Sequence, residues 1–238
     1  MKLKKIASLA LAGIMAVSML TACGEANNND DTQKPTEPDV TPAAGYSATF
    51  EGRLSALAAS NIDMSDSTDL NSALKAAMDF AADGHIAFDY DNKWNNTVTF
   101  IASTKGGSDL NQVAIELINK ADTNKESLGK DSALNTLKVL NPLSGDVAYD
   151  KDNVDVVMLY VVDGGLSTDA AVMEVADKVN SEIEKLVKTY NTANTAETTH
   201  EVDYNYTGSV SAGTITLEAD HGKSMTFVAV EVVRHLGR

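Results

Sequence analysis

Apolar residues recur at helical spacing in three stretches of the chain. Residues 68–82, 110–121 and 168–190 each carry apolar side chains at intervals of three and four, which places them on one face of a helix. In the first stretch these residues are Leu70, Ala73, Leu74 and Ala77. The pattern predicts three amphipathic helices.

Other stretches alternate between apolar and polar residues, which is the pattern of a half-buried strand. They predict strands at residues 46–54, 85–90, 97–103, 202–210, 214–219 and 225–233. The second and third of these would form one hairpin, and the last two would form another. Residues 154–162 are nearly all apolar, which predicts a central strand covered on both faces. Residues 46–238 are therefore predicted to be a single α+β domain, a mostly antiparallel sheet with packed helices.

Two segments of the chain resemble each other. Residues 98–122 align without gaps on residues 156–180, so that a pair of glycines coincides. This similarity predicts two copies of a helix–hairpin–helix unit, near residues 66–124 and 130–190. Chance similarity between two segments of mixed structure is the alternative.

The first copy has three additional residues in its hairpin loop, Trp94, Asn95 and Asn96. An aromatic ring on a loop can stack on a ligand or anchor an interface, and an asparagine amide both donates and accepts hydrogen bonds. We therefore expect this loop to bind a partner such as a glycan or a peptide backbone. The alternative is that Trp94 folds back onto its own sheet.

The first 25 residues carry a separate pattern. Three lysines precede the uncharged apolar run at residues 6–20, which is typical of a secretory signal peptide. The sequence Leu-Thr-Ala-Cys at residues 20–23 follows, and it resembles the lipobox of bacterial lipoproteins. The resemblance implies that a peptidase removes residues 1–22 and that Cys23 becomes the lipidated, palmitate-bearing N-terminus. Two or more acyl chains give stable anchoring, so we expect the protein on the extracytoplasmic face of the cell membrane.

An ordinary signal peptide followed by an incidental cysteine is the alternative to this lipid anchor. Residues 24–45 are rich in Asn, Asp, Thr, Pro, Glu and Ala and show no apolar periodicity. Such a composition buries too little apolar surface to fold by itself. The segment is therefore predicted to be a disordered tether between Cys23 and the globular domain.

The chain is acidic, with 34 Asp and Glu residues against 19 Lys and Arg residues and a formal net charge of −15. A negative surface repels phosphate groups, so nucleic acid is not an expected partner. Cys23 is the only cysteine, and once lipidated it leaves no thiol for a disulfide, a nucleophile or a metal ligand. The expected partners are the membrane, through the lipid on Cys23, and an envelope glycan or protein.

The sequence contains no motif that points to a catalytic or metal centre. The four histidines, His85, His200, His221 and His235, lack metal-ligand spacing, and no Gly-x-Ser-x-Gly motif occurs. The Asp-x-Asp-Asn turns lack the glycine and glutamate of an EF-hand loop. No catalytic residue, metal or cofactor is therefore expected.

The leading functional interpretation is a membrane-anchored lipoprotein that acts as a non-enzymatic binding or structural module of the cell envelope. The first alternative is an envelope-acting hydrolase whose site the sequence does not reveal. The second is a small solute-binding lipoprotein of a transporter, which is disfavoured because two α/β lobes normally need a longer chain.

The lipobox generates a direct prediction for Cys23→Ala. The variant should accumulate as an unmodified precursor or as a secreted form, because the acceptor of the lipid is gone. Detergent partitioning and the intact mass of the protein measure this. A variant that still enters the detergent phase with the wild-type mass would contradict the assignment.

Overall fold

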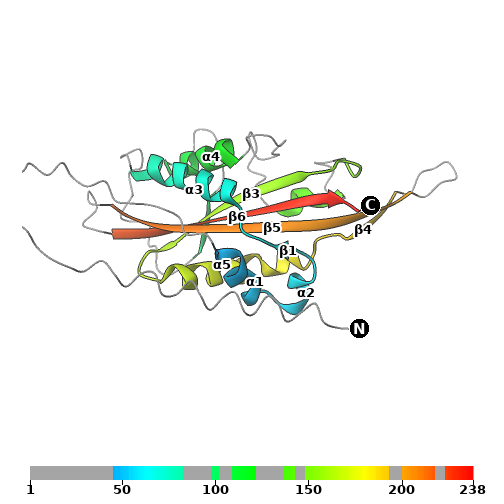
Figure 1. Cartoon of the computed structure of the whole chain (residues 1–238), viewed down its shortest axis with the longest axis horizontal. Helices are drawn as coiled ribbons and strands as arrows, with labels where there is room; N and C mark the ends of the chain where they lie inside the picture. Colours follow the sequence, from blue (N-terminus) through cyan, green and yellow to red (C-terminus); the bar gives the residue numbers. More distant parts are fainter. Residues whose placement is uncertain are drawn as a thin grey trace, which may run out of the picture. The chain divides into compact units, whose positions relative to one another are not determined.

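The computed structural model describes residues 45–82, 98–101, 109–121, 137–142, 148–192, 200–217 and 223–237. The helices in these residues are α1 (Tyr46–Arg53), α2 (Ala56–Ala59), α3 (Thr68–Phe80), α4 (Asp109–Ala121), the 3-10 helix η3 (Leu137–Leu140) and α5 (Thr168–Ile183). The strands are β1 (Asp63–Met64), β2 (Thr99–Ile101), β3 (Val154–Asp163), β4 (Thr189–Thr192), β5 (His200–Leu217) and β6 (Lys223–Leu236). The predicted α+β class is confirmed (Figure 1).

The described strands form a mixed sheet in the order β1-β5-β6-β3-β2, and β4 pairs with β5. Every pair is antiparallel except β1 with β5. Strand β6 has β5 on one side and β3 on the other. The long β5–β6 hairpin and β3 therefore form the centre of the sheet.

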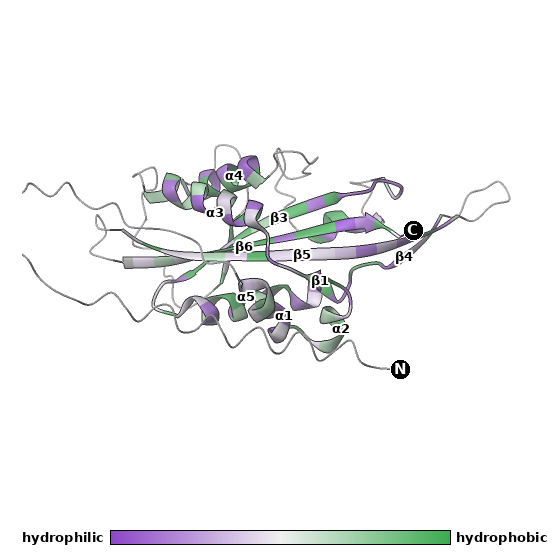
Figure 2. Ribbon diagram, viewed as in Figure 1, coloured by the Kyte–Doolittle hydropathy of each residue, from purple (hydrophilic) through white to green (hydrophobic). Residues whose placement is uncertain are grey.

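Both faces of the sheet are covered, which explains the apolar run predicted at residues 154–162. Even-numbered residues of β3, such as Met158, pack in a core with α1, α2 and α5. Odd-numbered residues, such as Leu159, pack in a second core with α3 and α4. Figure 1 shows these two groups of helices on opposite sides of the sheet, and Figure 2 shows the hydrophobic middle of β3 and β6 between them.

Helices α3 and α4 confirm two of the three predicted helices. The side chain of Ser67 caps α3 by accepting a hydrogen bond from the Leu70 amide at 3.1 Å, the contact for which serine is favoured at this position. The apolar residues of the predicted stripes are buried between these two helices and the sheet. None of the described helices is both long and apolar enough to cross a bilayer.

The prediction of a strand at residues 46–54 is wrong, because this segment forms the helix α1. Ser47, Phe50 and Leu54 are buried, at the intervals of three and four that a helix requires. Ala48 and Gly52, which completed the apparent alternation, are exposed. Counting small residues as core positions produced the wrong period.

The helix predicted at residues 168–190 is too long. Helix α5 ends at Ile183, and Tyr190 lies in β4, opposite Val202. The Tyr204 amide donates to the Lys188 carbonyl at 2.8 Å, and the Tyr206 hydroxyl donates to the Val187 carbonyl at 2.7 Å. These bonds hold the backbone after α5 against the sheet, so the apolar stripe continues in a strand and not in a helix.

The remaining strand predictions have mixed outcomes. The strands predicted at 202–210 and 214–219 are parts of one strand, β5, which is unbroken as far as Leu217. Gly213 lies opposite Phe227, so a residue without a side chain faces a large aromatic residue of β6, and the strand pairing continues through this position. The strand predicted at 97–103 appears as β2, and its proposed hairpin partner at 85–90 lies outside the described residues.

The two proposed copies of a repeat, near residues 66–124 and 130–190, are not confirmed. Both contain a strand followed by a helix, but α4 and α5 pack on opposite faces of the sheet. The gapless alignment places Ile101 on Leu159. Ile101 belongs to the same core as α4, whereas Leu159 faces away from α5. The helix placement therefore differs between the two segments.

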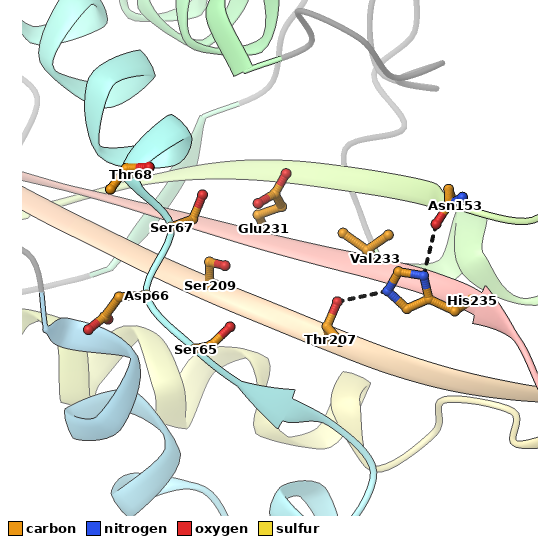
Figure 3. Close-up of a pocket in the computed structure, with 10 residues that line it drawn as sticks. All are labelled: Ser65, Asp66, Ser67, Thr68, Asn153, Thr207, Ser209, Glu231, Val233 and His235. Atoms are coloured by element: carbon orange, nitrogen blue, oxygen red, sulfur yellow. Dashed lines mark hydrogen bonds between the residues drawn. The ribbon is translucent and has the colours of Figure 1, made fainter.

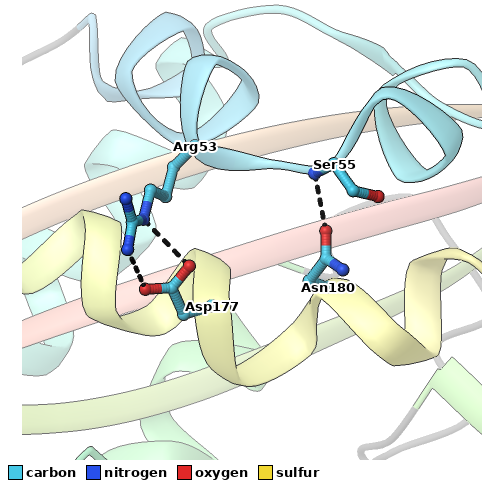
Figure 4. Close-up of polar contacts among 4 residues, drawn as sticks. All are labelled: Arg53, Ser55, Asp177 and Asn180. Carbon is cyan, nitrogen blue, oxygen red and sulfur yellow. Dashed lines mark hydrogen bonds and ion pairs between the residues drawn. The ribbon is translucent and has the colours of Figure 1, made fainter.

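Polar contacts fix α1 and α2 on α5 (Figure 4). Arg53 forms a bidentate ion pair with Asp177, at 2.9 Å from Nε and 2.6 Å from Nη2. The Ser55 amide donates to Asn180 Oδ1 at 2.8 Å. Hydrogen bonds from Ser55 and Asn180 lower the pKa of Glu184. The ion pair is about half exposed, so the buried apolar residues of α1 contribute most of the attachment energy.

A buried arginine makes a second set of polar contacts on this side of the sheet. Arg234, in β6, donates to the carbonyl oxygens of Leu140 at 2.8 Å, Ala148 at 2.9 Å and Lys151 at 3.3 Å. Its guanidinium also lies 4.7 Å from the centre of the Tyr204 ring. Burial lowers the pKa of this group, but arginine stays charged in proteins. One side chain thus joins η3 and the turn before β3 to the sheet.

Leu159→Ala should lower the free energy of unfolding by about 2–5 kcal/mol, because it leaves a cavity in a packed core. Leu159 is 1% exposed, whereas Leu57 in α2 is 58% exposed. Leu57→Ala is therefore the matched control, with an expected change of at most about 0.5 kcal/mol. Urea denaturation measures both, and equal effects would contradict the described core.

Arg234→Met should lower the free energy of unfolding by about 2–5 kcal/mol, because carbonyl groups that lose their donor inside the protein cost about 1–3 kcal/mol each. Arg53→Met makes the same change at an exposed ion pair and should cost less than about 1 kcal/mol. Thermal or urea unfolding compares the two variants. A larger loss for Arg53→Met would show that the Arg234 contacts do not hold the fold.

Candidate functional site

The structure does not test the binding site predicted from the sequence. Trp94, Asn95 and Asn96 lie outside the described residues, and so does Cys23. Of the four histidines considered as ligands, only His235 has a described side chain. The candidate site presented here is one that the sequence analysis missed.

An open hollow of about 600 Å³ lies between the start of α3 and the sheet (Figure 3). It is lined by Ser65, Asp66, Ser67 and Thr68 before and at the start of α3, by Asn153 before β3, by Thr207 and Ser209 of β5, and by Glu231, Val233 and His235 of β6. All of these residues except Val233 are polar. The volume falls within the range of small-molecule sites, roughly 300–1,000 Å³.

The floor of the hollow continues the sheet face that α3 and α4 cover. Farther along this face, Phe227 and Ala229 of β6 are fully buried core residues. Glu231 and His235 occupy later alternate positions of the same strand, and alternate positions share one face. The face therefore changes from apolar to polar along β6. In the sequence, Glu231 interrupts an apolar run between residues 227 and 233. This interruption is the sequence signal from which a polar site on this strand could have been predicted.

The segment before α3, which contains Ser65 and Asp66, forms the wall of the hollow and is held in place by hydrogen bonds. The Ser65 amide donates to the Gly208 carbonyl at 2.9 Å, which extends the pairing of β1 with β5. Ser47 of α1 is buried, and its hydroxyl donates to the Ser65 carbonyl and accepts from the Val210 amide, both at 3.0 Å. The segment before α3 is thus joined to both α1 and β5.

His235 of β6 is joined to β5 and to the residue before β3 at one end of the hollow. Its Nδ1 lies 3.0 Å from Asn153 Oδ1, and its Nε2 lies 2.9 Å from the Thr207 hydroxyl. Because the Asn153 oxygen can only accept, Nδ1 carries a proton, and Nε2 forms the second hydrogen bond with the Thr207 hydroxyl, which can donate or accept. Asn153 has a φ of 55°, a left-handed conformation that asparagine adopts more readily than most residues.

The Asp-x-Asp-Asn turn at residues 150–153 has a structural role. Asp152 Oδ1 accepts hydrogen bonds from the amides of Asn153 and Leu236, both at 2.9 Å. These contacts are the local side-chain-to-backbone bonds that favour Asp and Asn in turns. Within the described ranges, no group of three or more His, Cys, Asp or Glu side chains could hold a metal ion.

The charges that line the hollow are acidic. Glu231 is 6% exposed and lies on the floor, opposite Ser209 in β5. Asp66 lies on the wall and accepts from the Ser47 amide at 3.3 Å. No lysine or arginine is among the lining residues described above. Asp155 of β3 is fully buried and lies opposite Val233 of β6. It is therefore diagonal to Glu231 on the same face of the sheet. The arrangement therefore offers hydroxyl, amide and carboxylate groups that suit hydrogen bonding to a polar ligand.

No protein-family model, no curated protein and no solved structure matches this chain. The roles of its residues therefore have to be derived from their own contacts. Among the described residues, those contacts converge on the hollow beside α3.

Proposed function

We propose that this chain is a lipid-anchored binding module of the cell envelope that holds a small polar ligand in the hollow beside α3. The observation that carries the proposal is the change from apolar to polar residues along one face of β6. The polar side chains on this face carry donors and acceptors that line an open hollow. A polar ligand of matching size can form hydrogen bonds with them.

The location of the protein belongs to the same proposal. The resemblance of residues 20–23 to a lipobox supports lipidation of Cys23 and an extracytoplasmic position at the membrane. A ligand would then come from the envelope or its surroundings, and an envelope glycan or protein remains a candidate partner. The acidic chain favours neutral or cationic partners over anionic ones.

A hydrolase is the second candidate function, because Thr207, His235 and Asn153 form a hydroxyl–imidazole–amide chain. This order of groups is the one that activates a nucleophile in many hydrolases. Such enzymes also need backbone donors for the oxyanion, often including the amide next to the nucleophile. Thr207 lies within the β5–β6 ladder, so its backbone is engaged in strand pairing. Binding is therefore the better supported function.

A solute-binding protein of a transporter is less well supported. Such proteins normally close two α/β lobes around a cleft. The described residues form one continuous sheet with helices on both faces, and the hollow lies on one face of that sheet.

Ser209→Leu should abolish ligand capture, because the larger side chain fills the floor of the hollow. The lipidated protein in detergent is incubated with the low-molecular-mass fraction of its own cell envelope, and bound compounds are identified by mass spectrometry. Wild-type protein should retain a compound that Ser209→Leu does not. Thr216→Leu, at an exposed position of the same strand, is the matched control and should bind normally.

Two outcomes of this experiment would count against a binding module. Equal capture by wild type and Ser209→Leu would place any ligand outside the hollow. Conversion of the compound by the wild type, with the intact compound retained by Thr207→Val, would favour the hydrolase.

A further inference from the structure

We infer that the hollow selects a hydroxyl-bearing ammonium compound of about monosaccharide size, with Glu231 as the acceptor for its ammonium group. The inference rests on the proposed function, since it names the chemical class of the ligand in the same hollow. It follows from the charge of the lining, the position of Glu231 and the hydroxyl groups around it.

The sign of the ligand charge follows from the lining. Glu231 and Asp66 are acidic, and the other described lining residues include no lysine or arginine. The positive end of α3 would favour an anion by itself. Asp66 precedes this helix and Asp69 lies in its first turn, and both carboxylates offset that partial charge. An anion would therefore be repelled from the floor, and a cation would be attracted to it.

The position of Glu231 makes it the anchor. It is 6% exposed, and a charge interacts more strongly with a partner in a partly buried site than in water. A carboxylate has about four lone-pair positions, so Glu231 can accept from a ligand in addition to protein donors. An ammonium group, with three donors and no acceptor, complements it directly.

The hydroxyl groups define the rest of the ligand. Ser209 lies opposite Glu231 in the β5–β6 ladder, and Figure 3 shows Ser67 and Ser209 on the side of the hollow nearest Glu231. The Ser67 oxygen accepts from the Leu70 amide, which leaves its O–H free to donate. Serine and threonine hydroxyls both donate and accept, as do the hydroxyl groups of a sugar. The volume of about 600 Å³ accommodates a molecule of that size.

Calorimetric titration of the full-length chain in detergent tests the inference with three matched probes. D-glucosamine, with its amine protonated, should bind more tightly than D-glucose by about ten-fold or more, which corresponds to one good charge-assisted contact. D-gluconate should bind least. Glu231→Gln should remove the preference for glucosamine over glucose. Glu201→Gln, an exposed acid of β5, makes the same charge change and should keep the preference.

Further variants separate the possible failures. Glu231→Asp keeps the charge and should retain the preference for glucosamine, which guards against misfolding of Glu231→Gln. If glucose or gluconate binds as tightly as glucosamine and Ser209→Leu blocks it, the ammonium inference is overturned and the binding function stands. If none of the three probes binds, the inference is also overturned. The proposed function fails with it only if the envelope fraction yields no ligand either.

Discussion

Two cores share the same strands, and this sharing is the constraint on which the structure depends. Each residue of β3 and β6 belongs to one face or the other, so a shift of one residue would exchange the two sets completely. The charged residues make such a shift especially unfavourable. It would move Arg234 out of its set of carbonyl acceptors and would turn Glu231 into the apolar core beneath α5. The charges thus help to specify the register.

Glu231 and Arg234 also show why sequence proximity misleads in a strand. They are three residues apart, and on a helix that spacing would suggest an ion pair. In β6 they point to opposite faces, and each serves a different region. Arg234 joins η3 and the turn before β3 to the sheet, whereas Glu231 lines the hollow. Structural and candidate ligand-binding charges are separated by the thickness of the sheet.

The sequence predicted those elements whose pattern includes several large apolar residues. The stripes of α3 and α4 and the continuous run of β3 have one interpretation each. The period of α1 was misread because Ala48 and Gly52 are small enough to face solvent, and the end of α5 was misread because an apolar stripe does not distinguish a helix from a following strand. The hollow brings together residues from four separate segments of the chain, so only the pairing of the strands reveals it.

Ser47 gives the position of α1 a mechanical consequence. Helix α1 follows directly on residues 24–45. The buried hydroxyl of Ser47 in this helix forms hydrogen bonds with both Ser65 and Val210. If Cys23 is anchored as proposed, tension on the chain arrives at α1 before it reaches any strand. The next contacts to carry that load are the wall of the hollow and β5. Pulling on the protein from its membrane end would therefore load the wall of the candidate binding site and the central strand β5 together.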